Sequence, residues 1–376
     1  MIYLDNAATT KPSKAAVDAM CKAAECFGNP SSLYGLGLDA EKLINQSKAV
    51  IAKKLGIEHR CIYFTSGGTE ANNTAVFGTA YAKEKLGKRL ITTQIEHPSV
   101  LEAFKKLEKD GFDVVYIGAE RNGRIKIDEL KEALNEDTVL VSVMHVNNET
   151  GVIQPVDEIK ALMKQKSPKA LLHCDCVQSF GKIPVEPKKW GADMITISAH
   201  KIHGFKGTGA LCVFNGKIRP LLYGGEQQEA FRPGTENVGG ILAFGAAAEE
   251  TEYSGKYLTE LRNEMKGLLL SKIDNIVING ADEYNSGSVL NVSFIGIKAE
   301  ILLHSLEVKG IYVSTGSACS SHKPQPSHVL TAMGADKREI QGAIRMSFDA
   351  GLTHEDIHKA AEIIESEVKT IRRFMR

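Results

Sequence analysis

Residues 194–214 have the sequence MITISAHKIHGFKGTGALCVF, and this stretch indicates a buried sheet with a polar site at its edge. The apolar, β-branched residues at 194–199 and 209–214 predict two strands that are covered on both faces. Lys201 stands between His200 and His203 and is followed by a glycine-rich run. A lysine at this point is either a solvated surface charge or a nucleophile in a crowded site, and the rest of the chain has to distinguish the two.

Similar apolar runs recur up to about residue 250. They predict strands at 61–65, 89–93, 113–118, 138–145, 170–175, 194–199 and 209–214. The segments between them include two helical patterns, HPSVLEAFKKLEKDG at 97–111 and PVDEIKALMKQK at 155–166. This alternation of strands and helices predicts an α/β fold with a mostly parallel sheet and helices on both of its faces.

The pattern changes after about residue 250. A long amphipathic helix is expected at 256–273, and it is followed by a strand, a helix, a short extended run and a terminal helix, at 287–294, 298–310, 311–315 and 353–374. These elements predict a second, smaller α+β domain. We expect residues 14–255 to form the large domain, and residues 1–13 together with 256–376 to form the small one.

Composition narrows the class of protein. The 376 residues include 46 Lys plus Arg and 46 Asp plus Glu, without a basic stripe, so direct nucleic-acid binding has little support. The N-terminus, MIYLDNAATTKPS, lacks the features of a signal peptide, and no apolar run is long enough to span a membrane. Seven cysteines, an odd number, argue against a disulfide framework. We therefore expect a cytoplasmic protein in which most cysteines are buried.

Four predicted strand ends carry polar clusters, and strand ends are where α/β enzymes place their chemistry. FTSGGTEANN, at 64–73, turns from a strand into a helix and is either a phosphate-binding helix start or an ordinary capped turn. His97 lies at the second end, where a structural role is the commoner one. Asp175 and Gln178 lie at the third, and Lys201 lies at the fourth.

Two kinds of site fit these clusters. The first is a metal site built from His173, Cys174, Cys176, His200 and His203. Consecutive strand residues point to opposite faces and no CxxC pair is present, so the spacing is poor for a metal. The second is a pyridoxal phosphate (PLP) site, which requires a lysine, a carboxylate for the ring nitrogen and donors for the phosphate. Lys201, Asp175 and the turn at 66–69 supply these three requirements.

Eight motifs together resemble one family. They are YLDNAATT, FTSGGTEANN, EHPSV, VNNETGVIQPV, HCDCVQSFGKIPV, SAHKIHGFKGTGALCVF, FRPGTEN and GSACSS, which occur in this order between residues 3 and 321. The set resembles the NifS/IscS-like cysteine desulfurases of the class V aminotransferase family. The resemblance implies the fold of the fold-type I PLP-dependent transferases, with PLP as the cofactor.

The resemblance also implies a role for each residue that contacts the cofactor. Lys201 would form the Schiff base, Asp175 would hold the ring nitrogen, and Gln178 would contact the ring hydroxyl. His97 would stack on the ring and transfer protons. Donors to the phosphate would be Gly68, Thr69, Ser198 and His200 of the same chain, with Thr235 reaching the cofactor of a neighbouring subunit. That last role implies a homodimer.

The remaining implied roles concern the substrate. Asn148 and Arg345 would hold the carboxylate of L-cysteine, a task that suits a planar bidentate donor. Cys319 lies among small and polar residues with prolines after it, which predicts an exposed, mobile loop. In the family this cysteine accepts the sulfur as a persulfide.

The expected activity is an L-cysteine desulfurase that produces L-alanine and an enzyme-bound persulfide. The persulfide would pass to an acceptor protein, such as an iron–sulfur scaffold or a tRNA-thiolation enzyme. One alternative is a selenocysteine lyase or another class V enzyme that uses the same cofactor. Another alternative, from a different class, is a non-catalytic metal-binding protein that uses the His and Cys clusters.

Overall fold

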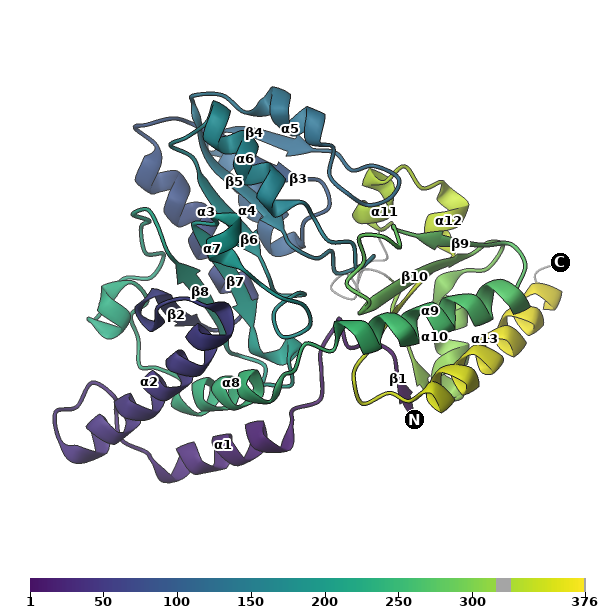
Figure 1. Ribbon diagram of the computed structural model, residues 1–376, viewed down its shortest axis with the longest axis horizontal. Coiled ribbons are helices and arrows are strands. Elements are labelled where there is room, and N and C mark those ends of the chain that lie inside the picture. The colour runs from purple at the N-terminus through teal and green to yellow at the C-terminus, as the bar shows by residue number, and fades with distance from the viewer. Residues whose placement is uncertain (316–325, 375–376) are drawn as a thin grey trace.

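The structure is a computed structural model, and it describes residues 1–315 and 326–374. Figure 1 shows two sheets side by side, a large one on the left and a small one on the right. The N-terminal strand lies with the small sheet, and the chain then crosses to the helices beneath the large sheet.

The large sheet has seven strands in the order β2-β8-β7-β6-β5-β3-β4. Strands β3 to β7 run parallel to one another, whereas β8 is antiparallel to both β2 and β7. The mostly parallel α/β sheet is therefore confirmed. The strands are β2 (Ile62–Thr65), β3 (Arg89–Thr93), β4 (Asp113–Ile117), β5 (Thr138–Met144), β6 (Leu171–Asp175), β7 (Met194–Ser198) and β8 (Gly209–Val213).

Neighbouring residues of a strand point to opposite sides of the sheet. Because these strands are apolar at most positions, both faces of the sheet are apolar. In β7, Ile195 and Ile197 belong to one buried cluster, whereas Met194 belongs to the cluster on the other face. Helices cover both faces (Figure 1). They are α1 (Lys14–Glu25), α2 (Gly35–Leu55), α3 (Gly68–Lys83), α4 (Pro98–Lys109), α5 (Ile127–Ala133), α6 (Val156–Lys166), α7 (Pro187–Trp190) and α8 (Val238–Glu250).

The small sheet is antiparallel, with the strand order β12-β10-β9. A separate strand pair joins β1 to β11 in parallel. The elements of this part are β1 (Ile2–Tyr3), α9 (Gly255–Lys272), β9 (Ile276–Asn279), β10 (Val289–Phe294), α10 (Ala299–Val308), β11 (Ile311–Tyr312), α11 (His328–Ala332), α12 (Lys337–Gln341), β12 (Ala343–Ser347) and α13 (His354–Phe374).

The apolar clusters support the proposed division of the chain into a large and a small domain. Ile2 and Leu4 are buried in one apolar cluster with side chains from residues 258–371, separate from the clusters of the large sheet. Helix α11 departs from this division, because Val329 and Leu330 pack with the large core.

The first ten residues connect the two parts at the site. Asp5 forms a bridge to Ser347 of β12, and the Thr10 N–H donates to the carbonyl of His200 at 2.9 Å. His200 belongs to the 3-10 turn η2 (Ala199–Lys201) that follows β7. The end of β7 therefore lies where the N-terminal segment passes between the two sheets.

Candidate active site

Asp175 ends β6, and both oxygens of its carboxylate are held. Oδ2 accepts from the Asn72 side-chain amide at 2.8 Å, and Oδ1 accepts from the Val177 N–H at 2.9 Å. The residue is only 5% exposed. A carboxylate fixed by two N–H groups in a buried position is well placed to pair with a cationic ring nitrogen. The sequence alone does not indicate Asn72, because its importance depends on a contact with a residue 103 positions away.

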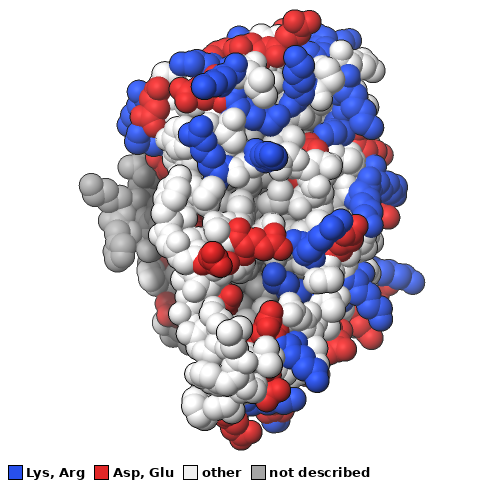
Figure 2. Space-filling model, turned by 90° about the vertical axis from the view of Figure 1, so that its left-hand side faces the viewer, with Lys and Arg blue, Asp and Glu red and all other residues white. Residues whose placement is uncertain are grey.

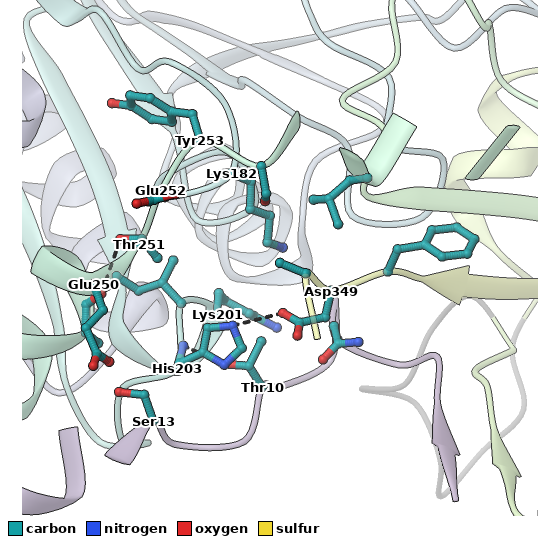
Figure 3. A pocket seen from close by; sticks show the side chains of 18 of the residues that line it. Thr10, Ser13, Lys182, Lys201, His203, Glu250, Thr251, Glu252, Tyr253 and Asp349 are labelled. Atoms are coloured by element: carbon teal, nitrogen blue, oxygen red, sulfur yellow. Dashed lines mark hydrogen bonds and ion pairs between the residues drawn. The ribbon is translucent and has the colours of Figure 1, made fainter. Parts of the chain in front are cut away.

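Lys201 is the last residue of η2. Its Nζ donates to the carbonyl oxygens of Ala7 at 2.6 Å and Ala8 at 2.7 Å. The amine therefore points into the interior, toward the N-terminal segment, and is not a solvated surface charge. Lys201 also lines a cavity of about 440 Å³ between the two parts of the chain. Figure 3 shows this cavity with Lys201, Lys182, His203 and Asp349 along its wall.

His97 is the N-cap residue of α4. Its Nδ1 accepts from the Ser99 N–H at 3.1 Å and lies 2.8 Å from the Ser99 hydroxyl. Because Nδ1 accepts a hydrogen bond, the neutral ring carries its proton on Nε2. Burial lowers the pKa of His97; the Asp175 carboxylate opposes this effect and the Lys201 ammonium adds to it. The imidazole is therefore neutral near pH 7.

The end of β7 lies beside the start of α3, and the groups there suit a phosphate. The Ser198 hydroxyl is buried and has no hydrogen-bond partner within the described part of the chain. It faces the start of α3: a Cβ added to Gly68 would lie 3.8 Å from the Ser198 Cβ and 3.0 Å from Val177 Cγ2. The first N–H groups of a helix lack partners within the helix and favour anions. Gly68, Thr69 and Ser198 therefore fit a phosphate group.

His200 and Gln178 contact the same N-terminal segment as Lys201. Nδ1 of His200 is 3.2 Å from the Thr9 hydroxyl. Burial, together with the Lys201 and Lys206 ammonium groups, lowers the pKa of His200 to about 4, so its ring is neutral and can donate one N–H. The Gln178 amide donates to the Ala7 carbonyl at 3.0 Å and accepts from Lys182 at 3.2 Å.

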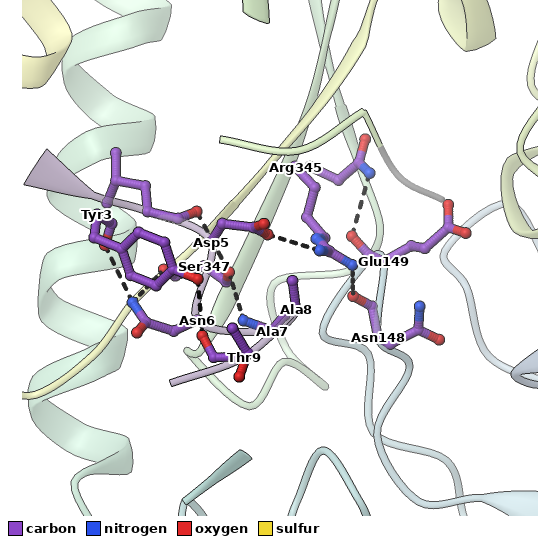
Figure 4. A network of polar contacts seen from close by, with 12 residues as sticks. Tyr3, Asp5, Asn6, Ala7, Ala8, Thr9, Asn148, Glu149, Arg345 and Ser347 are labelled. Carbon is purple, nitrogen blue, oxygen red and sulfur yellow. Dashed lines mark hydrogen bonds and ion pairs between the residues drawn. The ribbon is translucent and has the colours of Figure 1, made fainter. Parts of the chain in front are cut away.

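Arg345 meets the backbone of Asn148 and the side chain of Asp5, as Figure 4 shows. Arg345 is buried in β12; one guanidinium N–H group donates to the Asn148 carbonyl at 3.1 Å and another donates to the Asp5 carboxylate at 2.8 Å. Asp5 therefore fixes the direction of the guanidinium group. This partner was not identified from the sequence, because the two residues lie in segments 340 positions apart.

One of the expected residues lies in a different pocket, and another is not described. Thr235 lines a separate cavity of about 210 Å³ with Ser66, Thr208 and Asn237, beside the start of α3. Cys319 lies outside the described residues.

The cysteines beside Asp175 pack inward. Cys174, Cys176 and Cys212 are fully buried in the large core, and burial raises the pKa of each thiol. Cys212 belongs to β8 as expected, whereas Cys61, which was expected to begin a strand, ends the 3-10 turn η1 (His59–Cys61), one residue before β2. The strand starts later because residues 59–61 form that tight turn.

The geometry of the described residues does not support the alternative of a metal site. Among residues 1–315 and 326–374, no three His, Cys, Asp or Glu side chains come together as a group that could hold a metal ion. His173 lies inside the sheet, where its ring contacts Ser142 at 2.8 Å and Thr196 at 3.0 Å. His203 pairs with Asp349 at 2.9 Å.

Comparisons with known proteins identify the family of this chain. The model of the family described as aminotransferase class-V matches residues 2–359. Putative cysteine desulfurase IscS 1 of Bacillus subtilis is 41% identical over 98% of this chain and 99% of its own length. Cysteine desulfurase IscS of Methanosarcina thermophila is 43% identical over 99% of this chain and 93% of its own. A solved NifS-like protein is 37% identical, with a TM-score of 0.92 over 98% of this chain and 99% of that one.

The fold and these matches define a PLP-dependent enzyme of fold type I, and the chain belongs to the class V aminotransferase family. Within that family it belongs to the cysteine desulfurases of the NifS/IscS-like group. No helix in the described part of the chain is both long and apolar enough to cross a membrane.

Proposed function

We propose that this enzyme removes sulfur from L-cysteine, releases L-alanine and carries the sulfur as a persulfide on Cys319. The observation that carries the proposal is the convergence of Lys201, Asp175 and the Ser198–Gly68 cradle at one end of the sheet. These groups match the aldehyde, ring nitrogen and phosphate of PLP. When bound, PLP withdraws electrons from the α-carbon of an amino acid.

The side chains of the site then have separate tasks. Asp175 holds a proton on the ring nitrogen of the cofactor, since it offers a carboxylate that two N–H groups keep in place. His97 is neutral and carries its proton on Nε2, so it would donate that proton in the reaction. Arg345 binds the carboxylate of cysteine, with its direction set by Asp5 and the Asn148 carbonyl.

Sulfur transfer requires a thiolate, because the thiol is a poor nucleophile. In the proposed step, the thiolate of Cys319 attacks the sulfur of the bound cysteine. An S–S bond forms, the C–S bond breaks, and its electron pair remains on the carbon skeleton that becomes alanine. Cys174, Cys176 and Cys212 do not suit this step, because their burial in the core disfavours the thiolate.

A second copy of the chain would complete the site. Thr235 borders the start of α3 and is the residue proposed to reach the partner's cofactor. Five large apolar side chains between α1 and the first turns of α2 are exposed, namely Phe27, Leu33, Tyr34, Leu36 and Leu38. Figure 2, which views that side of the molecule, shows a broad uncharged area. An exposed apolar patch supports a homodimer. A fully active monomer, found by sedimentation at the assay concentration, would contradict a shared site.

The proposed partner is a cytoplasmic sulfur-acceptor protein, such as an iron–sulfur scaffold or a tRNA-thiolation enzyme. The names of the relatives support the desulfurase activity itself. The test is to incubate the enzyme with L-cysteine and a reductant and to measure both products. We expect equal amounts of alanine and sulfide. Release of pyruvate, or turnover of L-selenocysteine with no turnover of cysteine, would contradict the proposal.

A further inference from the structure

The side-chain amide of Gln178 lies between two groups that can each bind only one of its ends. The Lys182 ammonium is a pure donor, and it contacts Oε1 at 3.2 Å. The Ala7 carbonyl is a pure acceptor, and it contacts Nε2 at 3.0 Å. The amide therefore has one favourable orientation, with its NH₂ group toward Ala7 and Lys201.

This orientation matters because Lys201 binds the same carbonyl. Nζ of Lys201 donates to the Ala7 oxygen at 2.6 Å, so Gln178 and Lys201 meet at one atom. The NH₂ group has two hydrogens, and Ala7 accepts one of them. The second hydrogen can serve the ring oxygen of the cofactor that Lys201 binds. A flipped amide would present an oxygen to that ring oxygen and would repel it.

Lys182 occupies an unfavourable position for a lysine. It is only 9% exposed, and it lines the cavity between the two parts of the chain, where Figure 3 shows it beside Lys201 and Asp349. Burial lowers the pKa of Lys182 to about 8; the Asp349 carboxylate opposes this effect and the Arg345 guanidinium adds to it. Asp349 is itself paired with His203 at 2.9 Å. A buried lysine without a full ion pair costs stability, which favours a functional reason for its presence.

We propose that Lys182 is a positioning residue, which fixes the Gln178 amide so that its N–H faces the ring oxygen of PLP. The proposal rests on the proposed placement of the cofactor beside Gln178. Lys182 does not touch the reacting atoms. It acts by removing the second orientation of the amide, so its effect passes through Gln178 alone.

The experiment measures the affinity of the full-length apoenzyme for PLP and the absorption spectrum of the reconstituted enzyme. The variants are Lys182→Met, Gln178→Ala and the double variant. Loss of one oriented hydrogen bond should weaken PLP binding about five- to tenfold. We expect Gln178→Ala to show this loss in full and Lys182→Met to show part of it, because the Ala7 carbonyl still favours the same orientation of the amide. Both variants should shift the cofactor absorption. The double variant should be no worse than Gln178→Ala, because both changes remove the same contact.

Lys160→Met is the matched control. Lys160 is also largely buried and pairs with Asp193 at 2.6 Å, but neither residue contacts Gln178 or Lys201. Its PLP affinity and spectrum should remain unchanged. Normal PLP affinity and a normal spectrum in Lys182→Met, with a defect in Gln178→Ala, would overturn the proposed role of Lys182. The placement of the cofactor beside Gln178 would still stand. Normal values in Gln178→Ala would overturn the placement of the cofactor, and additive losses in the double variant would show that Lys182 acts by another route.

Discussion

Replacing Lys182 with Met should make the apoenzyme more stable near neutral pH. Burial lowers the pKa of this lysine from 10.5 to about 8, so the folded chain holds its charge at a cost. At about 1.4 kcal/mol per pKa unit, the cost is about 3 kcal/mol at pH 7. Met fills a similar volume without a charge. The variant leaves Gln178 Oε1 without its donor, which costs about 1 kcal/mol, so the net gain should be about 2 kcal/mol.

The pH dependence separates this effect from packing. The unfolded chain keeps the lysine proton up to about pH 10.5, whereas the folded chain keeps it only up to about pH 8. Raising the pH across this window therefore favours folded wild type, and it does not affect the variant through this group. The advantage of Lys182→Met should shrink by about 2 kcal/mol between pH 7.5 and pH 10.

Urea denaturation of both proteins at the two pH values provides the assay. Lys160→Met, which breaks a buried ion pair, should instead lower the free energy of unfolding at both pH values. A Lys182→Met variant that is less stable than wild type at pH 7.5 would refute the reasoning. So would an advantage that is the same at both pH values.

Two further predictions concern the cofactor. Borohydride treatment of the yellow holoenzyme should fix PLP to Lys201, and Lys201→Ala should bind PLP only non-covalently and lose turnover; peptide mapping checks the attachment, and an adduct on a different lysine would contradict it. Asp175→Asn should keep the fold and lower kcat by about two to three orders of magnitude, because a neutral amide no longer holds a proton on the ring nitrogen. Its new NH₂ group would also face the N–H of either Asn72 or Val177, so we expect a modest fall in the midpoint of thermal unfolding; near-normal turnover would argue against the role.

The sequence was most informative where local patterns decide the structure. The expected strand at 89–93 has the bounds of β3, and the other six strands of the large sheet differ by one residue at one end. Apolar runs define such strands because both faces of the sheet are buried. The Lys201 and Asp175 strand ends were recognised because their chemistry is local to short motifs.

The contacts that orient the site were not predictable in the same way. Asn72 holds Asp175, Asp5 holds Arg345, and Ala7 receives Lys201, each across more than 100 residues. These pairs form only when the sheet, α3 and the N-terminal segment come together. The sequence also does not indicate that Lys182 is buried. A lysine is normally exposed, and no local pattern marks this one as different.

The central claim is that sulfur leaves cysteine onto Cys319, and mass spectrometry of the protein after brief exposure to L-cysteine tests it most directly. We expect one added sulfur atom on the peptide that contains Cys319. The Cys319→Ser variant should still bind PLP and still change its absorption with cysteine, but carry no added sulfur and release almost no sulfide. A persulfide on Cys174 or Cys176, with Cys319→Ser still active, would contradict the account.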